Sequence, residues 1–383
     1  MVFLRLSSFA VLKRRLRKCE ISRKHRVEKF QVFVQSRTFE RKMKAVVYYS
    51  QRNMRVKDVP TPRIEEDEIL VNMKACGVCG SDLMDWYLRS RAPLVLGHEP
   101  AGVVARKGRK VEGFSVNDRV FVHHHVACMT CHYCLHGDHT LCQKFHETNI
   151  EPGGFAEYFK VPASNVRLDT LKIPDHLSFE EATLIEPVGC CIRALRKCEV
   201  HAGDSIAVIG AGATGLIHTA LARIYGASPI FVSDLIGFRL DFARKFGADF
   251  AINPNSENLK DIVRAETGGR GADVVVVTAP NLEAYKTGMD VCRKGGKISV
   301  FAPTIPADHL QISPKELFFS EVKIIPSYST SHLETRSALS LMETGRLRVG
   351  ELVTHRFRLK ETGKAFATAL EGRESLKVVV LNE

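Results

Sequence analysis

Long apolar runs are absent from this sequence. In its 383 residues, no stretch approaches the roughly 20 consecutive apolar residues that a membrane-spanning helix needs. The sequence therefore predicts no transmembrane helix and no membrane partner. Apolar residues (45%) and charged residues (26%) occur in the proportions of an ordinary globular protein, and the length suits two or three domains.

Acidic residues are scarce in residues 1–42, which hold thirteen Lys or Arg and three Glu and so carry a net charge of +10. The whole chain carries +12, so residues 43–383 are nearly neutral and give little reason to expect nucleic-acid binding by the folded body. The basic segment has three interpretations: an organelle-targeting peptide, a tail for nucleic acid or anionic membranes, and an extension without a role. We favour the third, with a disordered segment before a working chain that starts at Met43.

Eleven cysteines are present, and many of them stand in apolar or metal-like contexts, as Cys190, Cys191 and Cys292 do. This placement fits a reducing compartment. We expect a cytoplasmic protein, and the basic leader keeps organelle targeting open.

Four further cysteines form the strongest metal signal, at spacings of three, three and eight residues: Cys128, Cys131, Cys134 and Cys142. Thiolates this close in sequence converge on one ion, and four sulfur ligands without an open position make a structural zinc site. The alternatives are a disulfide pair and an iron–sulfur cluster. Intracellular proteins rarely keep disulfides, and ferredoxin spacings differ from this one and usually end in Cys-Pro. A structural site of this kind performs no chemistry, so the reaction is expected elsewhere in the chain.

A second set of ligand-type residues precedes this loop. Cys79 lies in CGVCGSD, and His98 and Glu99 lie in VLGHEPAG. A thiolate, an imidazole and a carboxylate are usual ligands of a catalytic zinc. Each residue alone is a weak signal, but the combination predicts a catalytic metal.

Glu186 stands in an apolar helical run that follows a capping-box pattern, Ser178 with Glu181 three residues later. A carboxylate among apolar residues is costly unless it is paired or lies near a cation. A solvent-facing Glu is the alternative. We prefer a role for Glu186 beside the metal or its water.

Residues 204–234 contain the second clear signal, a glycine motif between a strand and a helix. The strand IAVIG runs into Gly210, Gly212 and Gly215. A second strand ends at Asp234, nineteen residues after the last glycine, which completes the context of a dinucleotide-binding fingerprint. The first glycine allows a tight turn, the second lets the pyrophosphate approach the backbone, and the third lets the helix pack closely on the strand. The alternative is an α/β turn without a ligand.

Asp234 favours NAD over NADP, because it would bind the two ribose hydroxyls and repel a 2′-phosphate. Arg239 tempers this preference, since an arginine five residues on could lie over the adenine or meet a phosphate. The phosphates themselves are expected at the N-terminus of the helix after the glycines, where amide donors and the helix dipole favour anions.

Alternating apolar strands and helical segments continue to about residue 326, which predicts a parallel sheet with helices on both faces. After that, a helix over 331–345 and a final strand KVVVLNE are expected to return to the first domain.

The order of these motifs identifies a family. CGVCGSD, GHE, the four-cysteine loop, GGFAEY, IEP and GxGxxG with an acid follow one another as they do in zinc-dependent medium-chain alcohol dehydrogenases. The chain resembles this family from Met43 to Glu383, and Glu186 before a proline resembles the sorbitol and threonine dehydrogenase branch.

The resemblance implies an α/β fold with two domains. A mostly-β, GroES-like catalytic domain would comprise 43–186 and 327–383, with the zinc lobe at about 123–146, and a doubly wound Rossmann domain would comprise 187–326. It also implies two zinc ions per chain, a nicotinamide cofactor, a small alcohol as substrate, and a homodimer or homotetramer joined along the Rossmann sheet edge.

By the same resemblance, Cys79 and His98 would ligate the catalytic zinc, and Glu99 would be a direct ligand or swing away. Glu186 would ligate the zinc or hold its water, and Ser81 would pass on the substrate proton.

One departure concerns the relay histidine that many relatives carry five residues after the zinc cysteine, because Met84 stands there. Replacement by the histidines of 123–125 is one alternative, and we favour a strand that only feeds the lobe.

The function expected is zinc-dependent, NAD(P)-linked oxidation of a polyol or another secondary alcohol to a ketone. L-Threonine 3-dehydrogenase or sugar-phosphate dehydrogenase activity is the alternative within this chemistry. A zinc-free reductase and a non-catalytic NAD(H)-binding protein are the alternatives outside it. The substrate itself is open, and Trp86, Tyr87, Phe145 and Phe155 are candidates for its pocket wall.

Overall fold

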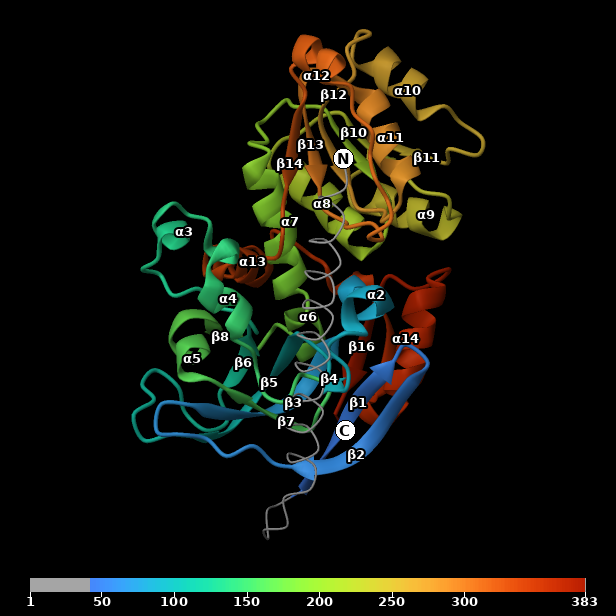
Figure 1. Ribbon diagram of the computed structural model, residues 1–383. Helices are drawn as coiled ribbons and strands as arrows, with labels where there is room; N and C mark the ends of the chain where they lie inside the picture. The colour runs from blue at the N-terminus through green and yellow to red at the C-terminus, as the bar shows by residue number, and fades with distance from the viewer. Residues whose placement is uncertain (1–41, 383) are drawn as a thin grey trace, which may run out of the picture.

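The computed structural model describes residues 42–382 (Figure 1). The predicted basic extension lies outside the described residues apart from Lys42, which begins the first strand. In the described part of the chain, no helix is both long and apolar enough to cross a membrane.

The lower half of the molecule in Figure 1 is built mainly from strands, and we call it the β half. Its seven-stranded sheet has the order β15-β16-β3-β5-β6-β8, with β7 paired to β3, and a three-stranded sheet β2-β1-β4 lies beside it. The strands are β1 (Lys42–Ser50), β2 (Asn53–Pro60), β3 (Ile69–Gly77), β4 (Leu94–Val95), β5 (Glu99–Lys107), β6 (Arg119–Val122), β7 (Tyr158–Val161), β8 (Thr170–Lys172), β15 (Val353–Arg358) and β16 (Lys377–Leu381).

The last strand of the β half comes from the far end of the sequence. β16 pairs in parallel with β15 and antiparallel with β3, where Val379 lies opposite Gly77. β3 in turn pairs antiparallel with β5, where Gly77 lies opposite Glu99. Three segments that are distant in the sequence therefore meet in adjacent strands.

The upper half in Figure 1 contains a six-stranded sheet in the order β11-β10-β9-β12-β13-β14, and we call it the nucleotide half. Every strand pair in this sheet is parallel, which confirms the predicted doubly wound sheet. The strands are β9 (Ile206–Ile209), β10 (Ile230–Ser233), β11 (Phe250–Ile252), β12 (Ala272–Val277), β13 (Cys292–Val300) and β14 (Lys323–Pro326).

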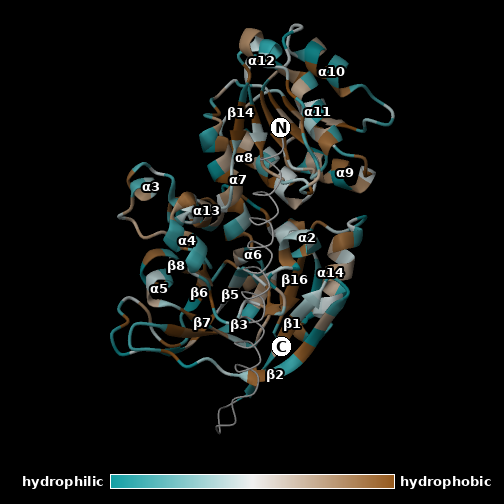
Figure 2. Cartoon of the chain, in the orientation of Figure 1, coloured by the Kyte–Doolittle hydropathy of each residue, from teal (hydrophilic) through white to brown (hydrophobic). Residues whose placement is uncertain are grey.

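Both faces of this sheet are buried. Its central strands are mostly apolar, and successive side chains point to opposite faces, so each face carries apolar side chains. In β9, Ile206 and Val208 join the core cluster of α7 and α8, whereas Ala207 and Ile209 join the cluster of α10 and α11. In Figure 2 the strands of this sheet are largely brown, which marks hydrophobic residues, and the ribbons of the surrounding helices carry both teal and brown residues. The helices are α7 (Ile185–Lys197), α8 (Ala213–Ile224), α9 (Gly237–Lys245), α10 (Leu259–Glu266), α11 (Leu282–Val291) and α12 (Pro314–Ser320).

The order of strands places a ligand site at the end of β9. Because β10 and β12 flank β9, the chain winds in opposite directions on its two sides, and ligands of such sheets bind at the carboxyl end of that strand. The glycine motif follows β9 directly.

The two halves share helix α7. It begins beside the β half and packs against α8 of the nucleotide half and against α13 (His332–Glu343). The predicted domain boundary between 186 and 187 falls inside this helix, so α7 is a direct connection between the halves.

Candidate active site and metal centres

The four cysteines of the predicted structural site converge in a lobe formed by α3 (His132–Leu135), 3-10 helix η2 (His139–Leu141) and α4 (Gln143–Glu147). Their ligand atoms all lie within 4.8 Å of one another. The Sγ atom of Cys134 is 3.9 Å from that of Cys128 and 3.5 Å from that of Cys131. The four thiols thus surround one point, as a tetrahedral ion requires.

The lobe backbone is arranged to stabilise thiolates. The N–H of Cys131 donates to Cys128 Sγ at 3.3 Å, and the N–H of Cys128 donates to Cys142 Sγ at 3.3 Å. Hydrogen bonds from Thr130 and from the Cys131 backbone lower the pKa of Cys128 to about 6, whereas burial raises the pKa of Cys134 to about 12. Four sulfur donors with backbone amides aimed at them fit a structural zinc ion.

A second cluster unites Cys79, His98 and Glu99, whose ligand atoms also lie within 4.8 Å of one another. Cys79 immediately precedes the 3-10 helix η1 (Gly80–Leu83), and its N–H donates to Asp82 Oδ2 at 3.1 Å. The other oxygen of Asp82 lies 3.4 Å from His98 Nδ1. One buried carboxylate therefore orients both the thiol segment and the imidazole, and a carboxylate behind a metal-binding histidine is a common arrangement.

Asp82 was not among the predicted site residues, although it stands three positions after Cys79 in CGVCGSD. Burial disfavours a charged imidazole, but Asp82 and Cys79 more than offset this and raise the pKa of His98 well above its ordinary value. The spacing of Asp82 from Cys79 was a usable signal, because an acid at the third position of a short helix can accept from the residue that precedes the helix.

Glu99 is fully buried at the start of β5. Its carboxylate contacts the Lys377 ammonium, and neither of its oxygens has a hydrogen-bond partner among the described residues. Burial raises the pKa of Glu99, with Lys377 and His98 acting in the opposite direction. A buried carboxylate with free lone pairs, next to a thiol and an imidazole, has the donor set of a catalytic zinc, so the residues present fit the predicted ion.

Lys377 is the second site residue that the sequence did not suggest. It lies in β16, is 4% exposed, and forms its ion pair with Glu99. Its position depends on the pairing of β16 with β3, and no motif in the sequence marks that pairing.

Glu186 lies at the first turn of α7 and is 5% exposed. It accepts a hydrogen bond from Cys190 Sγ at 3.3 Å, one helical turn further on. It does not belong to the mutually close set of Cys79, His98 and Glu99, although its charge contributes to the raised pKa of Glu99. Glu186 is thus near the cluster and buried, with a thiol as its hydrogen-bond partner.

The histidines of 123–125 follow β6 and lie along one side of the cluster. The His124 ring packs against that of His98 at 4.9 Å between centroids, and burial lowers the pKa of His124 well below its ordinary value. His123 Nδ1 is 2.8 Å from Asp169 Oδ2. Met84, which occupies the position of the relay histidine, lies at the N-terminus of the short helix α2 (Asp85–Leu88).

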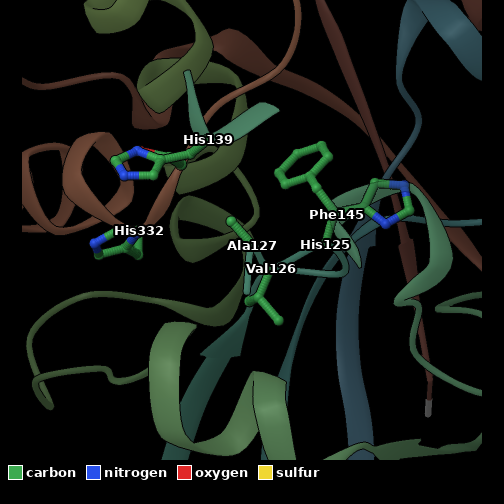
Figure 3. Close-up of a pocket in the computed structure, with 7 residues that line it drawn as sticks. His125, Val126, Ala127, His139, Phe145 and His332 are labelled. Carbon is green, nitrogen blue, oxygen red and sulfur yellow. The ribbon is translucent and has the colours of Figure 1, made fainter. Parts of the chain in front are cut away.

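Two of the four candidates for the pocket wall are buried. Phe145 and Phe155 are each 1% exposed and belong to the cores of the lobe and of the β half, where Phe155 packs against Phe366. Phe145 instead borders a small pocket between the lobe and α13 (Figure 3), which is lined by His125, Val126, Ala127, His139, Phe145, Ser331 and His332. Trp86 and Tyr87 are exposed.

The glycine motif has a different requirement at each position. Gly210 has a φ of +103°, which favours glycine, and a Cβ there would lie 2.7 Å from Thr278 Oγ1. A Cβ on Gly215 would overlap the Gly210 carbonyl, so this glycine permits close packing of α8 on β9. Around Gly212 there is open space, where a diphosphate could approach the backbone.

Asp234 follows β10 and closes the glycine loop. Its Oδ2 accepts from the N–H of Ala211 at 2.7 Å, and its Oδ1 accepts from the N–H of Ile236 at 2.9 Å. Arg239, on α9, places Nη1 3.5 Å from Asp234 Oδ2 and donates through Nη2 to the Gly372 carbonyl of the β half at 2.7 Å. The acid and the arginine are therefore already paired, and the arginine also ties the two halves together.

Comparisons with known proteins agree with this arrangement. Residues 65–175 match the family model of the alcohol dehydrogenase GroES-like domain, and residues 213–344 match that of the zinc-binding dehydrogenases. The chain is similar to the sorbitol dehydrogenase of Bacillus subtilis (strain 168), at 34% identity over 354 residues, which cover 90% of this chain and 98% of the relative. It is also similar to the L-threonine 3-dehydrogenase of Serratia proteamaculans (strain 568), at 31% identity over 331 residues, which cover 84% of this chain and 94% of the relative.

Solved structures extend the likeness to the whole fold. The alcohol dehydrogenase TADH from Thermus sp. ATN1 matches with a TM-score of 0.79 and 30% identity, over 89% of this chain and 100% of that chain. A zinc-binding dehydrogenase from Sinorhizobium meliloti 1021, bound to NADP, matches with a TM-score of 0.78 and 27% identity, over 89% and 100%.

Loss of one lobe thiol should release one metal ion. We expect Cys142→Ser to lower the zinc content by about one ion per chain and to lower the melting temperature, because metal binding contributes folding free energy to such lobes. Elemental analysis and thermal unfolding check this. Cys292→Ser, outside both clusters, serves as the control and should keep its zinc; equal zinc contents in the two variants would contradict the structural site.

Proposed function

The chain belongs to the zinc-dependent medium-chain alcohol dehydrogenase family and is an oxidoreductase acting on CH–OH groups, and from this premise we propose that it oxidises a polyol or a related secondary alcohol to the ketone. The observation that carries the proposal is the convergence of Cys79, His98 and Glu99 in a chain whose nucleotide half carries the glycine motif. Similarity to a sorbitol dehydrogenase over nearly its whole length supports a polyol as the substrate class.

The side chains have distinct roles in this proposal. Cys79 and His98 would hold zinc, which supplies Lewis-acid polarisation of the alcohol oxygen when bound. Asp82 fixes the orientation of both ligands through its two oxygens. Ser81, half-buried two residues after Cys79, would relay the hydroxyl proton: its Oγ would accept that proton while its own hydroxyl proton passes to water.

The nucleotide half would hold the nicotinamide cofactor, with the diphosphate at the open space around Gly212. We propose NAD in preference to NADP, because the carboxylate of Asp234 stands where the ribose hydroxyls would bind. Arg239 is engaged by Asp234 and by Gly372, which leaves it poorly placed to meet a 2′-phosphate.

Threonine 3-dehydrogenase activity is the second candidate, because relatives with that name are about as similar as the polyol enzymes. Both reactions oxidise a secondary alcohol and need the same metal cluster. The two activities would differ in the protein side chains that bind the part of the substrate outside the reacting alcohol carbon.

We also propose a homodimer or homotetramer joined along the edge of the parallel sheet. Among the described strands, β14 pairs only with β13, so its other edge is open. Phe318 and Phe319 of α12, directly before β14, are 75% and 71% exposed. Exposed edge strands with apolar neighbours are usually covered by a partner, and a second copy offers the same surface by symmetry.

A cytoplasmic location is proposed from the thiols. All ten cysteines in the described residues are free, which suits a reducing compartment.

The first experiment combines elemental analysis with turnover. We expect about two zinc ions per chain and NAD reduction with polyols, in a panel that also contains secondary alcohols, sugar phosphates and threonine. Asp82→Asn should lower activity by about 10- to 100-fold, because it loosens the orientation of two ligands, whereas Asp118→Asn, at a distant ion pair with Lys172, should not. One zinc ion and no turnover would favour the non-catalytic, NAD(H)-binding alternative.

Cofactor preference should respond to Asp234. We expect Asp234→Ser to shift the ratio of kcat/KM for NAD to that for NADP toward NADP by about tenfold or more, since a charged hydrogen-bond acceptor is lost and a repulsion is removed. Asp241→Ser, on the exposed side of α9, is the matched control. An unchanged ratio in Asp234→Ser would place the ribose elsewhere.

The oligomer should depend on the aromatic pair before β14. We expect Phe319→Asp to shift the sedimentation coefficient from an oligomer to a monomer, because a charge would be buried in the interface. Leu370→Asp, equally a charge at an exposed apolar site but on the β half, should leave the oligomer unchanged. A monomeric parent protein would reject the proposed interface outright.

A further inference from the structure

A buried lysine from the end of the sequence lies against the metal cluster. Val379 of β16 lies opposite Gly77 of β3, and Gly77 lies opposite Glu99 of β5. Lys377 is two residues before Val379, and residues two apart in a strand share a face of the sheet. The lysine side chain can therefore cross β3 toward the carboxylate.

Gly77 makes this crossing possible. A Cβ at Gly77 would lie 2.7 Å from Lys377 Cε and would overlap the Glu99 carboxylate. The absence of a side chain thus opens the space in which the ammonium and the carboxylate meet. This glycine is needed for the contact rather than for an unusual backbone angle.

The pair is isolated from water and from other hydrogen bonds. Lys377 is 4% exposed and Glu99 is 0% exposed. Burying either charge alone would cost several kcal/mol, so each group depends on the other. Yet neither carboxylate oxygen has a hydrogen-bond partner among the described residues, and the ligand atom of Glu99 lies within 4.8 Å of those of Cys79 and His98. The same carboxylate is thus within reach of two cations, the ammonium and a metal ion.

We propose that Lys377 is a positioning residue that holds Glu99 back from the metal, so that the ammonium and the metal ion compete for one carboxylate. With Glu99 engaged by Lys377, the coordination position that Glu99 would otherwise fill stays open for the substrate oxygen. Without the ammonium, the metal is the strongest cation left for a buried carboxylate, and Glu99 becomes a permanent ligand. This inference rests on the proposed function of the cluster.

The test replaces the lysine by a neutral side chain of similar length. In the full-length zinc-loaded protein, we expect Lys377→Met to slow the release of catalytic zinc to a chelator by about tenfold, the lower end of the effect of outer-shell groups on metal affinity. The release phase of the catalytic zinc is identified by its loss in Cys79→Ser. Cobalt placed in the site should show a changed d–d spectrum, and kcat should fall because the open position is filled.

Lys297→Met is the matched control. Lys297 is a largely buried lysine whose Nζ lies 2.9 Å from Glu199 Oε2, in the nucleotide half. It should leave zinc release and the cobalt spectrum as they are in the parent protein, whatever its effect on stability.

A second variant keeps the proposal testable if Lys377→Met does not fold. Because Glu99 is held away from the metal in the parent protein, Lys377→Met/Glu99→Gln, which removes both charges together, should release zinc at the parental rate. Faster release from this double variant would show that Glu99 already ligates in the parent protein, which overturns the proposal. So would unchanged release and an unchanged cobalt spectrum in Lys377→Met. If the parent protein binds two zinc ions and shows turnover, either of these results would reject the role of Lys377 but not the proposed function.

Discussion

Charge buried away from water is tolerated only when an opposite charge lies against it, and the β half is arranged around that requirement. Glu99 is enclosed completely, and a lysine from the last strand reaches it through the space left by a glycine. The buried carboxylate of Asp82, in η1, lies against the half-buried His98 ring. Each pairing fixes a side chain that would otherwise turn toward water, and together they leave a thiol, an imidazole and a carboxylate converging on one point.

In the nucleotide half, backbone N–H groups stabilise a largely buried carboxylate. The carboxylate of Asp234 is held by two amide donors, one of them from the glycine loop itself. The loop and the acid are therefore one rigid unit before any cofactor enters. Arg239 extends this unit to the carbonyl of Gly372 in the β half, and α7 provides a second connection between the halves. Two direct links therefore join the half that carries the glycine motif to the half that carries the metal cluster.

Residues that lie within a compact motif could be predicted from the sequence. The four lobe cysteines, the glycines and the acid after β10 act through neighbours a few positions away, so their spacing carries the information. Lys377 and the Arg239–Gly372 contact depend on segments that meet only in the folded chain, and no local pattern marks them. Phe155 was suggested for the pocket wall because it is aromatic, and the structure shows that it packs in the core of the β half against Phe366.

The β half is discontinuous in sequence, whereas the strands of the nucleotide half form one continuous segment, and this has a consequence for synthesis. Chains emerge from the ribosome N-terminus first, and domains tend to fold as units while they do so. The nucleotide half can complete its sheet with β14, but the sheet of the β half must wait for β15 and β16. Until then Glu99 has no ammonium to pair with, and the thiol and imidazole stand in an unfinished sheet. The β half can therefore complete its sheet only after every strand of the nucleotide half has been synthesised.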